Sequence, residues 1–196
     1  MKRFLLILMV SVISLPYAQA EDVEVRREKI IKDFISDYQA AYQAENLHYI
    51  KQFFSNDALI LTESGEFRKA GAEIIPHSTK TRPYNTLIED RTQYIERLEK
   101  YFNDNDHVSL GISNVLITQH QKYKDIYGVN FFQIWDDTGD VNIYENRMPG
   151  YIFIMVDFRN SEVEPVIHIR TWQPKANIKH PTDKYKLTDF TIITSR

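Results

Sequence analysis

The spacing of apolar residues changes once along this chain, from the helical period of about 3.6 to the strand period of 2. Between residues 21 and 44 the apolar side chains recur every three or four positions. The same spacing returns at 92–102, where Tyr94 is among the residues expected to face inward. After that, apolar and polar residues alternate as in strands, in the segments 108–119, 126–135, 151–158 and 163–172. The order predicts an α+β fold in which helices are followed by a meander of long antiparallel strands.

The segment between the first and last predicted helices is less regular. Asn46 is placed to cap a short second helix, because its side-chain oxygen can accept from a free N–H of the first turn. Residues 55–57 predict a turn and residues 58–61 a short buried strand. From 62 to 90 glycines and prolines interrupt the pattern, which predicts a long excursion with a short strand around Phe67.

The first 20 residues have the pattern of a cleavable secretory signal peptide. A basic start, MKR, precedes an apolar run at 4–15, Pro16 is expected to break the helix, and 18–20 (AQA) is a small–x–small cleavage site. The run is shorter than the roughly 20 residues that span a bilayer, so an N-terminal membrane anchor is the weaker alternative. We expect cleavage after Ala20, a mature chain from Glu21 with no membrane span, and a periplasmic or secreted location.

Composition limits the mature chain further. Its 176 residues favour one domain at 21–196, with a core at about 29–174 and a C-terminal extension at 175–196 whose apolar patch 190–193 is expected to add an edge strand. The absence of cysteine excludes disulfides and thiolate chemistry. Without Lys2 and Arg3 there are 22 basic residues against 27 acidic ones, a balance that argues against a nucleic-acid partner. The six histidines form no metal-binding motif, and we expect neither a metal nor a cofactor.

Four strings in this sequence resemble a known superfamily. They are ENLHYIKQFFSNDALIL (45–61), YGVNFFQIW (127–135), GYIFIMVDFRN (150–160) and VIHIRTWQP (166–174). Together they resemble the NTF2-like superfamily, also called cystatin-like or SnoaL-like, and the last three resemble exported NTF2-like domains of Bacteroides-type bacteria. The resemblance implies a cone: three N-terminal helices packed in a strongly curved antiparallel sheet, with a pocket at the open end. The superfamily contains isomerases, dehydratases, cyclases and association domains, so function has to be argued from the site.

The predicted strands carry the candidate catalytic residues. On simple alternation His168 and Arg170 share a face of the last long strand, and Asp157 lies on the strand before it. If Asp157 and Arg170 pair inside the cone, His168 is left as a general acid–base. The competing interpretation is a cross-strand ion pair on a sheet with one solvated face. The predicted ligand pocket is lined by Tyr38, Tyr42, Gln133, Trp135, Asp157, His168, Arg170 and Trp172.

These observations favour an exported binding or association domain that recognises a small molecule or an envelope component. The alternative is an enzyme of the isomerase, dehydratase or cyclase kind that uses Asp157, His168 and Arg170. A third hypothesis is a structural unit that forms a homodimer through the outer face of its sheet.

Overall fold

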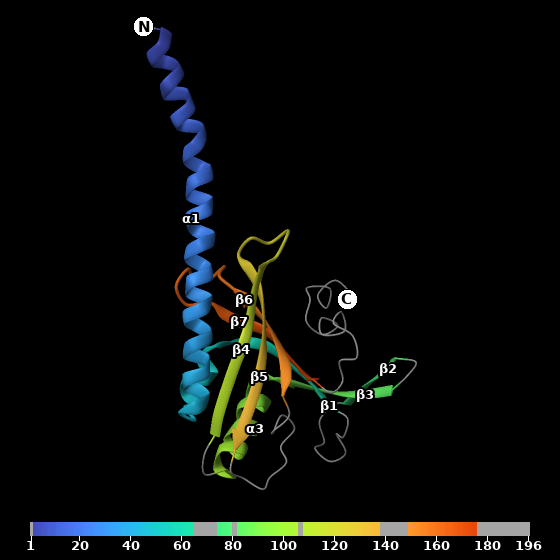
Figure 1. The fold of residues 1–196 in the computed structure, drawn as a ribbon. Coiled ribbons are helices and arrows are strands. Elements are labelled where there is room, and N and C mark those ends of the chain that lie inside the picture. Colours follow the sequence, from blue (N-terminus) through green and yellow to red (C-terminus); the bar gives the residue numbers. More distant parts are fainter. Residues whose placement is uncertain (1, 65–73, 80–81, 106–107, 138–148, 176–196) are drawn as a thin grey trace. The chain divides into compact units, whose positions relative to one another are not determined.

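The computed structural model describes residues 2–64, 74–79, 82–105, 108–137 and 149–175 (Figure 1). The chain divides into two compact units, Met1–Asp37 and Tyr38–Arg196. The predicted strand around Phe67 and the apolar patch 190–193 lie outside the described residues.

The first unit is formed by the greater part of helix α1 (Lys2–Gln43). The helix continues through Pro16, so the expected break there is wrong: proline removes one backbone hydrogen bond, and the neighbouring turns continue on either side. Farther along, Phe34 and Ile35 are buried while Lys32 and Asp33 are exposed, which confirms the predicted amphipathic pattern. Among the described residues, no helix is both long and apolar enough to cross a membrane.

The second unit contains the last residues of α1, two further helices and seven strands in one sheet. The strand order is β2-β3-β1-β7-β6-β5-β4. The bounds are α2 (Leu47–Gln52), β1 (Phe54–Ser64), β2 (Ile74–Thr79), β3 (Arg82–Asp90), α3 (Arg91–Asn103), β4 (Val108–Gln119), β5 (Ile126–Asp137), β6 (Gly150–Asp157) and β7 (Val166–Pro174).

The antiparallel meander of β4 to β7 is confirmed, but two parts of the predicted architecture are wrong. The sheet is mixed, because β1 runs parallel to β7, with Ile60 opposite Arg170. In addition, α3 follows β3, so the described part has three helices of which only α1 and α2 precede the sheet. The α+β class therefore holds, and the connectivity differs from three helices followed by an antiparallel sheet.

The described residues of the region predicted as an excursion, 62–64, 74–79 and 82–90, are strand. β1 starts at Phe54 and extends to Ser64, and β3 pairs antiparallel with it from Leu59 onward. The predicted turn at 55–57 lies where the register of β1 against β7 is irregular. Pro76 lies on β2, the edge strand, where a missing N–H donor is tolerated. Backbone pairing with β1 therefore outweighs the local glycine and proline signals.

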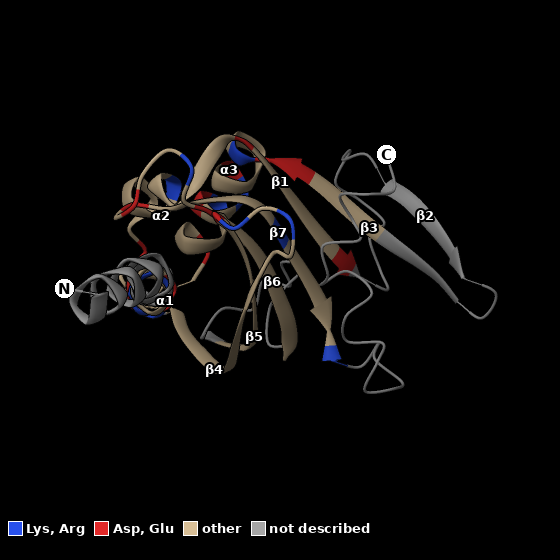
Figure 2. Ribbon diagram, turned by 90° about the horizontal axis from the view of Figure 1, so that it is seen from above, with Lys and Arg blue, Asp and Glu red and all other residues tan. Residues whose placement is uncertain are grey.

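Local capping explains where the two short helices begin. Asn46 Oδ1 accepts a hydrogen bond from the backbone N–H of Tyr49 at 3.0 Å, which confirms the predicted cap of α2. Asp90 and Gln93 form a capping box at the start of α3, each side chain accepting from the other's backbone N–H. The box fixes α3 directly at the end of β3, and α3 packs against β1 and β3 (Figure 2).

One glycine is required by close packing. A Cβ on Gly150 would lie 2.4 Å from Trp172 Nε1 and 2.8 Å from the carbonyl oxygen of Gln173. Because a backbone atom is among these neighbours, the site cannot relax by a side-chain movement alone. Gly111, by contrast, would place a Cβ no closer than 3.7 Å to any neighbour.

We predict that Gly150→Ala lowers the free energy of unfolding by about 1–3 kcal/mol, the usual cost of overpacking. Gly111→Ala is the matched control on the same sheet and is expected to be neutral or slightly stabilising, because alanine restricts the unfolded chain more than glycine does. Urea unfolding monitored by circular dichroism measures both. Equal stabilities for the two variants would show that the packing of Trp172 over Gly150 is not restrictive.

Candidate functional site

A one-residue shift in the register of β7 against β6 determines which face of the sheet each β7 side chain occupies. Met155 lies opposite Ile169 and Val156 opposite Ile167, so His168 has no cross-strand partner on β6. Directly opposed residues of an antiparallel pair share a face of the sheet. This β-bulge therefore places Arg170 on the opposite face from Asp157. Simple alternation would have placed the two residues on the same face.

The face that carries Arg170 also carries Ile60, Val129 and Ile154, all fully buried. Tyr94 of α3 and the last residues of α1 contact Arg170 from this side, and we call it the helix-covered face. The face that carries Asp157 also carries Met155 and Ile169, and we call it the opposite face.

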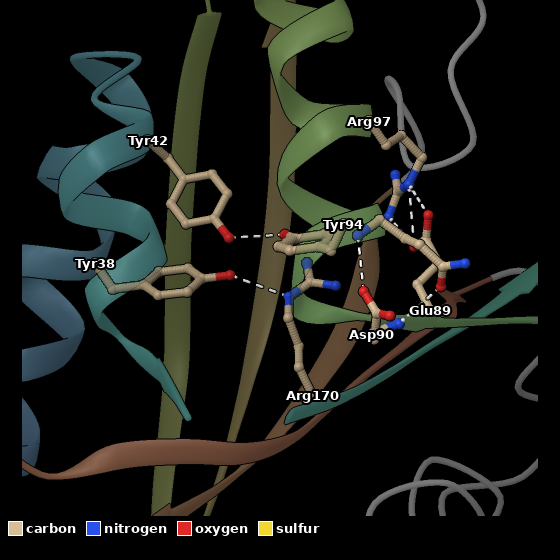
Figure 3. A network of polar contacts seen from close by, with 8 residues as sticks. Tyr38, Tyr42, Glu89, Asp90, Tyr94, Arg97 and Arg170 are labelled. Atoms are coloured by element: carbon tan, nitrogen blue, oxygen red, sulfur yellow. Dashed lines mark hydrogen bonds and ion pairs between the residues drawn. The ribbon is translucent and has the colours of Figure 1, made fainter. Parts of the chain in front are cut away.

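Three tyrosines surround the guanidinium of Arg170 on the helix-covered face (Figure 3). Arg170 Nε donates to Tyr38 Oη at 3.1 Å, and the guanidinium lies 5.2 Å from the centre of the Tyr94 ring. The hydroxyls of Tyr42 and Tyr94 are 2.7 Å apart and hydrogen-bonded. All four side chains are fully buried. We call Tyr38, Tyr42, Tyr94 and Arg170 the tyrosine–arginine cluster.

Helix geometry brings the tyrosines to this position. Tyr38 and Tyr42 are four residues apart, hence neighbours on one side of α1, and their ring centres are 4.4 Å apart. Tyr94 lies in the first turn of α3, whose position is set by the capping box. The cluster therefore joins two helices to the middle of the sheet.

A largely buried ion pair adjoins the cluster. Arg97 of α3 donates to both carboxylate oxygens of Glu89, with Nη2 to Oε2 at 2.8 Å and Nε to Oε1 at 2.8 Å. The Arg97 guanidinium also lies 5.1 Å from the centre of the Tyr94 ring. Tyr94 thus contacts the guanidinium groups of both Arg97 and Arg170.

The electrostatics keep the Tyr42 hydroxyl protonated. Burial raises the pKa of Tyr42 well above its ordinary value, and the neighbouring hydroxyls of Tyr38 and Tyr94 raise it further, against a smaller lowering by Arg170. A protonated, buried hydroxyl can donate or accept a hydrogen bond. The cluster is therefore suited to holding polar groups of a bound molecule in place.

Other predicted pocket residues lie on the same face as the cluster. Gln133 and Trp172 are fully buried, and Trp135 is nearly so. The Trp135 ring packs edge-on against Tyr42 at 5.7 Å. Five of these lining residues are thus brought together with Arg170 in the helix-covered interior, namely Tyr38, Tyr42, Gln133, Trp135 and Trp172.

Asp157 and His168 lie elsewhere, so the predicted pairing of Asp157 with Arg170 is wrong. Asp157 is on the opposite face, where Arg159 Nη2 contacts its Oδ2 at 2.6 Å and Arg159 Nε contacts Oδ1 at 3.0 Å. His168 Nε2 lies 3.0 Å from the same Oδ2, and its Nδ1 lies 3.6 Å from Asp57 Oδ1. The three candidate catalytic residues do not form one site, because the bulge at His168 separates Arg170 from Asp157 and His168.

Tyr94, Glu89 and Arg97 are not among the site residues predicted from the sequence. Tyr94 was expected to face inward as part of the core, which is correct, but its hydroxyl contact with Tyr42 depends on the packing of α3. Glu89 directly precedes the cap residue Asp90, and Arg97 lies in the second turn of α3. Their ion pair could have been suspected from that spacing. No group of three or more potential ligand residues able to hold a metal ion occurs in the part of the chain that the structure describes.

Comparison with solved structures identifies the fold as NTF2-like, or cystatin-like. A scytalone dehydratase-like protein from Novosphingobium aromaticivorans superposes with a TM-score of 0.57 at 13% identity, covering 79% of this chain and 88% of that one. An NTF2-like protein from Cytophaga hutchinsonii gives 0.52 at 10% identity, covering 75% and 97%. A chain of naphthalene 1,2-dioxygenase gives 0.57 at 11% identity, covering 79% and 81%.

Sequence comparison adds no closer relative: no protein-family model and no curated protein matches this chain. At these identities the structural similarity establishes the fold and leaves the chemistry open.

The Asp157–Arg159 pair makes stability depend on pH. Burial raises the pKa of Asp157, but the hydrogen bonds and charge of Arg159 together outweigh burial and hold the pKa below its ordinary value. A lowered pKa stabilises the folded state above the unfolded pKa of about 3.9. That contribution is lost as the pH falls through the lower pKa of the folded state.

We therefore predict that Arg159→Met lowers the free energy of unfolding at pH 7 by about 1–3 kcal/mol, because it leaves a buried carboxylate without its main partner. The difference from the unmodified chain should shrink at pH 3, where Asp157 of the variant is protonated. Urea unfolding at the two pH values measures this, with Lys51→Met on an exposed position as control. A difference that is the same at both pH values would contradict the assignment.

Proposed function

We propose that this chain is an exported domain that binds a small molecule on the helix-covered face of its sheet, against the tyrosine–arginine cluster. The observation that carries the proposal is the complete burial of Arg170 among three tyrosines. Removing a guanidinium from water is costly, and apolar residues of similar volume would stabilise a purely structural core at least as well. A buried cation beside tyrosine hydroxyls can bind the polar group of a small ligand by charge and by hydrogen bonds.

Binding has better support than the catalytic alternative. The isomerase, dehydratase or cyclase hypothesis needs an acid–base group beside the polarising residues. Asp157 and His168, the residues predicted for that role, contact Arg159 and Asp57 on the opposite face. The tyrosine–arginine cluster can orient and polarise a bound molecule without them.

Three further elements of the proposal rest on the sequence. Cleavage of the signal peptide after Ala20 would place the mature chain in the periplasm or outside the cell. There the domain would meet imported molecules and envelope components. The resemblance to exported domains of Bacteroides-type bacteria and the homodimer remain predictions from the sequence.

Ligand binding can be tested by screening the purified chain against small aromatic and alicyclic molecules, with thermal denaturation and NMR as readouts. We expect molecules that raise Tm to lose about tenfold in affinity in Arg170→Met, which removes the cation of the cluster, and in Tyr38→Phe, which removes the hydroxyl that orients it. Tyr38→Phe keeps the ring and guards against a folding defect in Arg170→Met. Lys100→Met, exposed on α3, is the control. Binders that tolerate both variants would move the site away from the cluster.

Export can be tested by expressing the full chain in a Gram-negative host and measuring the mass of the protein in each cell fraction. We expect the periplasmic or external fraction to contain a chain that begins at Glu21. An Ala20→Pro variant should block cleavage and leave the longer chain attached to the membrane fraction. A full-length chain confined to the cytoplasm would contradict the proposed location.

A further inference from the structure

A group of buried polar atoms on the helix-covered face lacks hydrogen-bond partners. Within the described residues, neither amide atom of Gln133 has a partner, and the indole nitrogens of Trp135 and Trp172 also have none. The exposed fractions of these side chains are 0%, 4% and 0%. Buried polar groups are almost always paired in native proteins, so several unpaired ones on a single face require an explanation.

Gln133 and Trp172 both adjoin Gly150, the first residue of β6. Gln133 on β5 lies opposite Gly150 on β6, so the two positions share a face and are about 5 Å apart. Trp172 Nε1 occupies the space above Gly150, 2.4 Å from where its Cβ would be. The missing side chain at Gly150 thus leaves room for the Trp172 indole on the face that carries Gln133.

The third residue is held in place by aromatic contacts. Trp135 follows Gln133 by two positions on β5, hence on the same face, and its ring packs edge-on against Tyr42 and Tyr101 at 5.7 and 5.3 Å. Phe131, two positions before Gln133, packs edge-on against Tyr38 at 6.1 Å. Gln133 is therefore flanked along β5 by rings that contact both tyrosines of α1 in the cluster.

The chemistry of these atoms is strongly biased towards donors. The amide of Gln133 offers two N–H donors and one acceptor oxygen, and each indole offers one N–H donor and no acceptor. The guanidinium of Arg170 adds positive charge on the same face. A ligand that satisfies this group must bring acceptor oxygens and must tolerate aromatic walls.

We infer that Gln133, Trp135 and Trp172 form the recognition group of the site, and that it selects a planar molecule bearing a carbonyl or carboxylate oxygen. This inference rests on the proposed function and names the ligand class. The acceptor oxygen receives hydrogen bonds from the indoles and the amide, while the ring system lies among the aromatic side chains of β5 and α1. Without ligand the buried donors lack hydrogen bonds, which is unfavourable in free energy, and the bound ligand supplies those hydrogen bonds.

The alternative explanation is that these residues only fill the core. In that case Gln133 would only lower the stability of the fold, because leucine has a similar size and no amide to desolvate. The two explanations agree that Gln133→Leu is folded and at least as stable as the unmodified chain. They differ in that only the recognition role predicts a loss of binding.

The test uses the fact that the chain has two tryptophans and that both belong to the recognition group. In a ¹H–¹⁵N NMR spectrum of the full folded chain, their two indole N–H signals report directly on the proposed donors. Benzoate and acetophenone are titrated as acceptor-bearing probes, and ethylbenzene as a probe of similar shape without an acceptor. We expect the first two to shift the indole signals downfield and to bind at least about tenfold more tightly than ethylbenzene.

Gln133→Leu should weaken benzoate binding by about tenfold while Tm stays the same or rises. Gln121→Leu, an exposed position in the turn between β4 and β5, is the matched control and should change neither quantity. Equal affinity for ethylbenzene, unshifted indole signals, or unchanged benzoate binding by Gln133→Leu would each overturn the inference.

Failure of the inference and failure of the proposed function give different results. Molecules that bind in an Arg170-dependent and Tyr38-dependent manner but ignore Gln133 and the indoles would leave the proposed function in place and remove the recognition group. Absence of any cluster-dependent binder in the wider screen would instead remove both.

Discussion

The register shift at His168 determines which side chains of the last two strands meet. Without it, β7 would present its residues in strict alternation, and Ile167 and Arg170 would lie on opposite faces. The extra residue places both of them on the helix-covered face. Arg170 thereby reaches Tyr38 and Tyr94, and Asp157 is left with Arg159 and His168 on the other face. The contacts of Arg170 with Tyr38 and Tyr94 depend on this single irregularity.

The features that depend on local sequence were predictable. The amphipathic pattern of α1, the Asn46 cap, the span of α3 and the four strands β4 to β7 all follow from periodicity and capping chemistry. The shared face of Gln133 and Trp135 could also be predicted, because alternation is undisturbed on β5.

The features that depend on pairing between distant segments could not be predicted from the sequence. The bulge at His168 leaves no signature in VIHIRTWQP, since polar and apolar residues alternate there as in a regular strand. The strand character of 82–90 comes from backbone pairing with β1, and the turn signals in that region conceal it. The role of Tyr94 depends on where α3 packs, which is fixed by the junction with β3. In each case a tertiary contact outweighs the local pattern.

The parallel pairing of β1 with β7 has a consequence for how the chain folds. Ile60 and Arg170 lie opposite each other although about 110 residues separate them, and β1 connects the β2–β3 hairpin to the rest of the sheet. Contacts of such long range are slow to form, because the entropy of closing the loop is lost before the pairing compensates it. The centre of this sheet cannot assemble until nearly all of the second unit has been synthesised. Until β7 has been synthesised, the edge of β1 that pairs with it lacks its backbone partner.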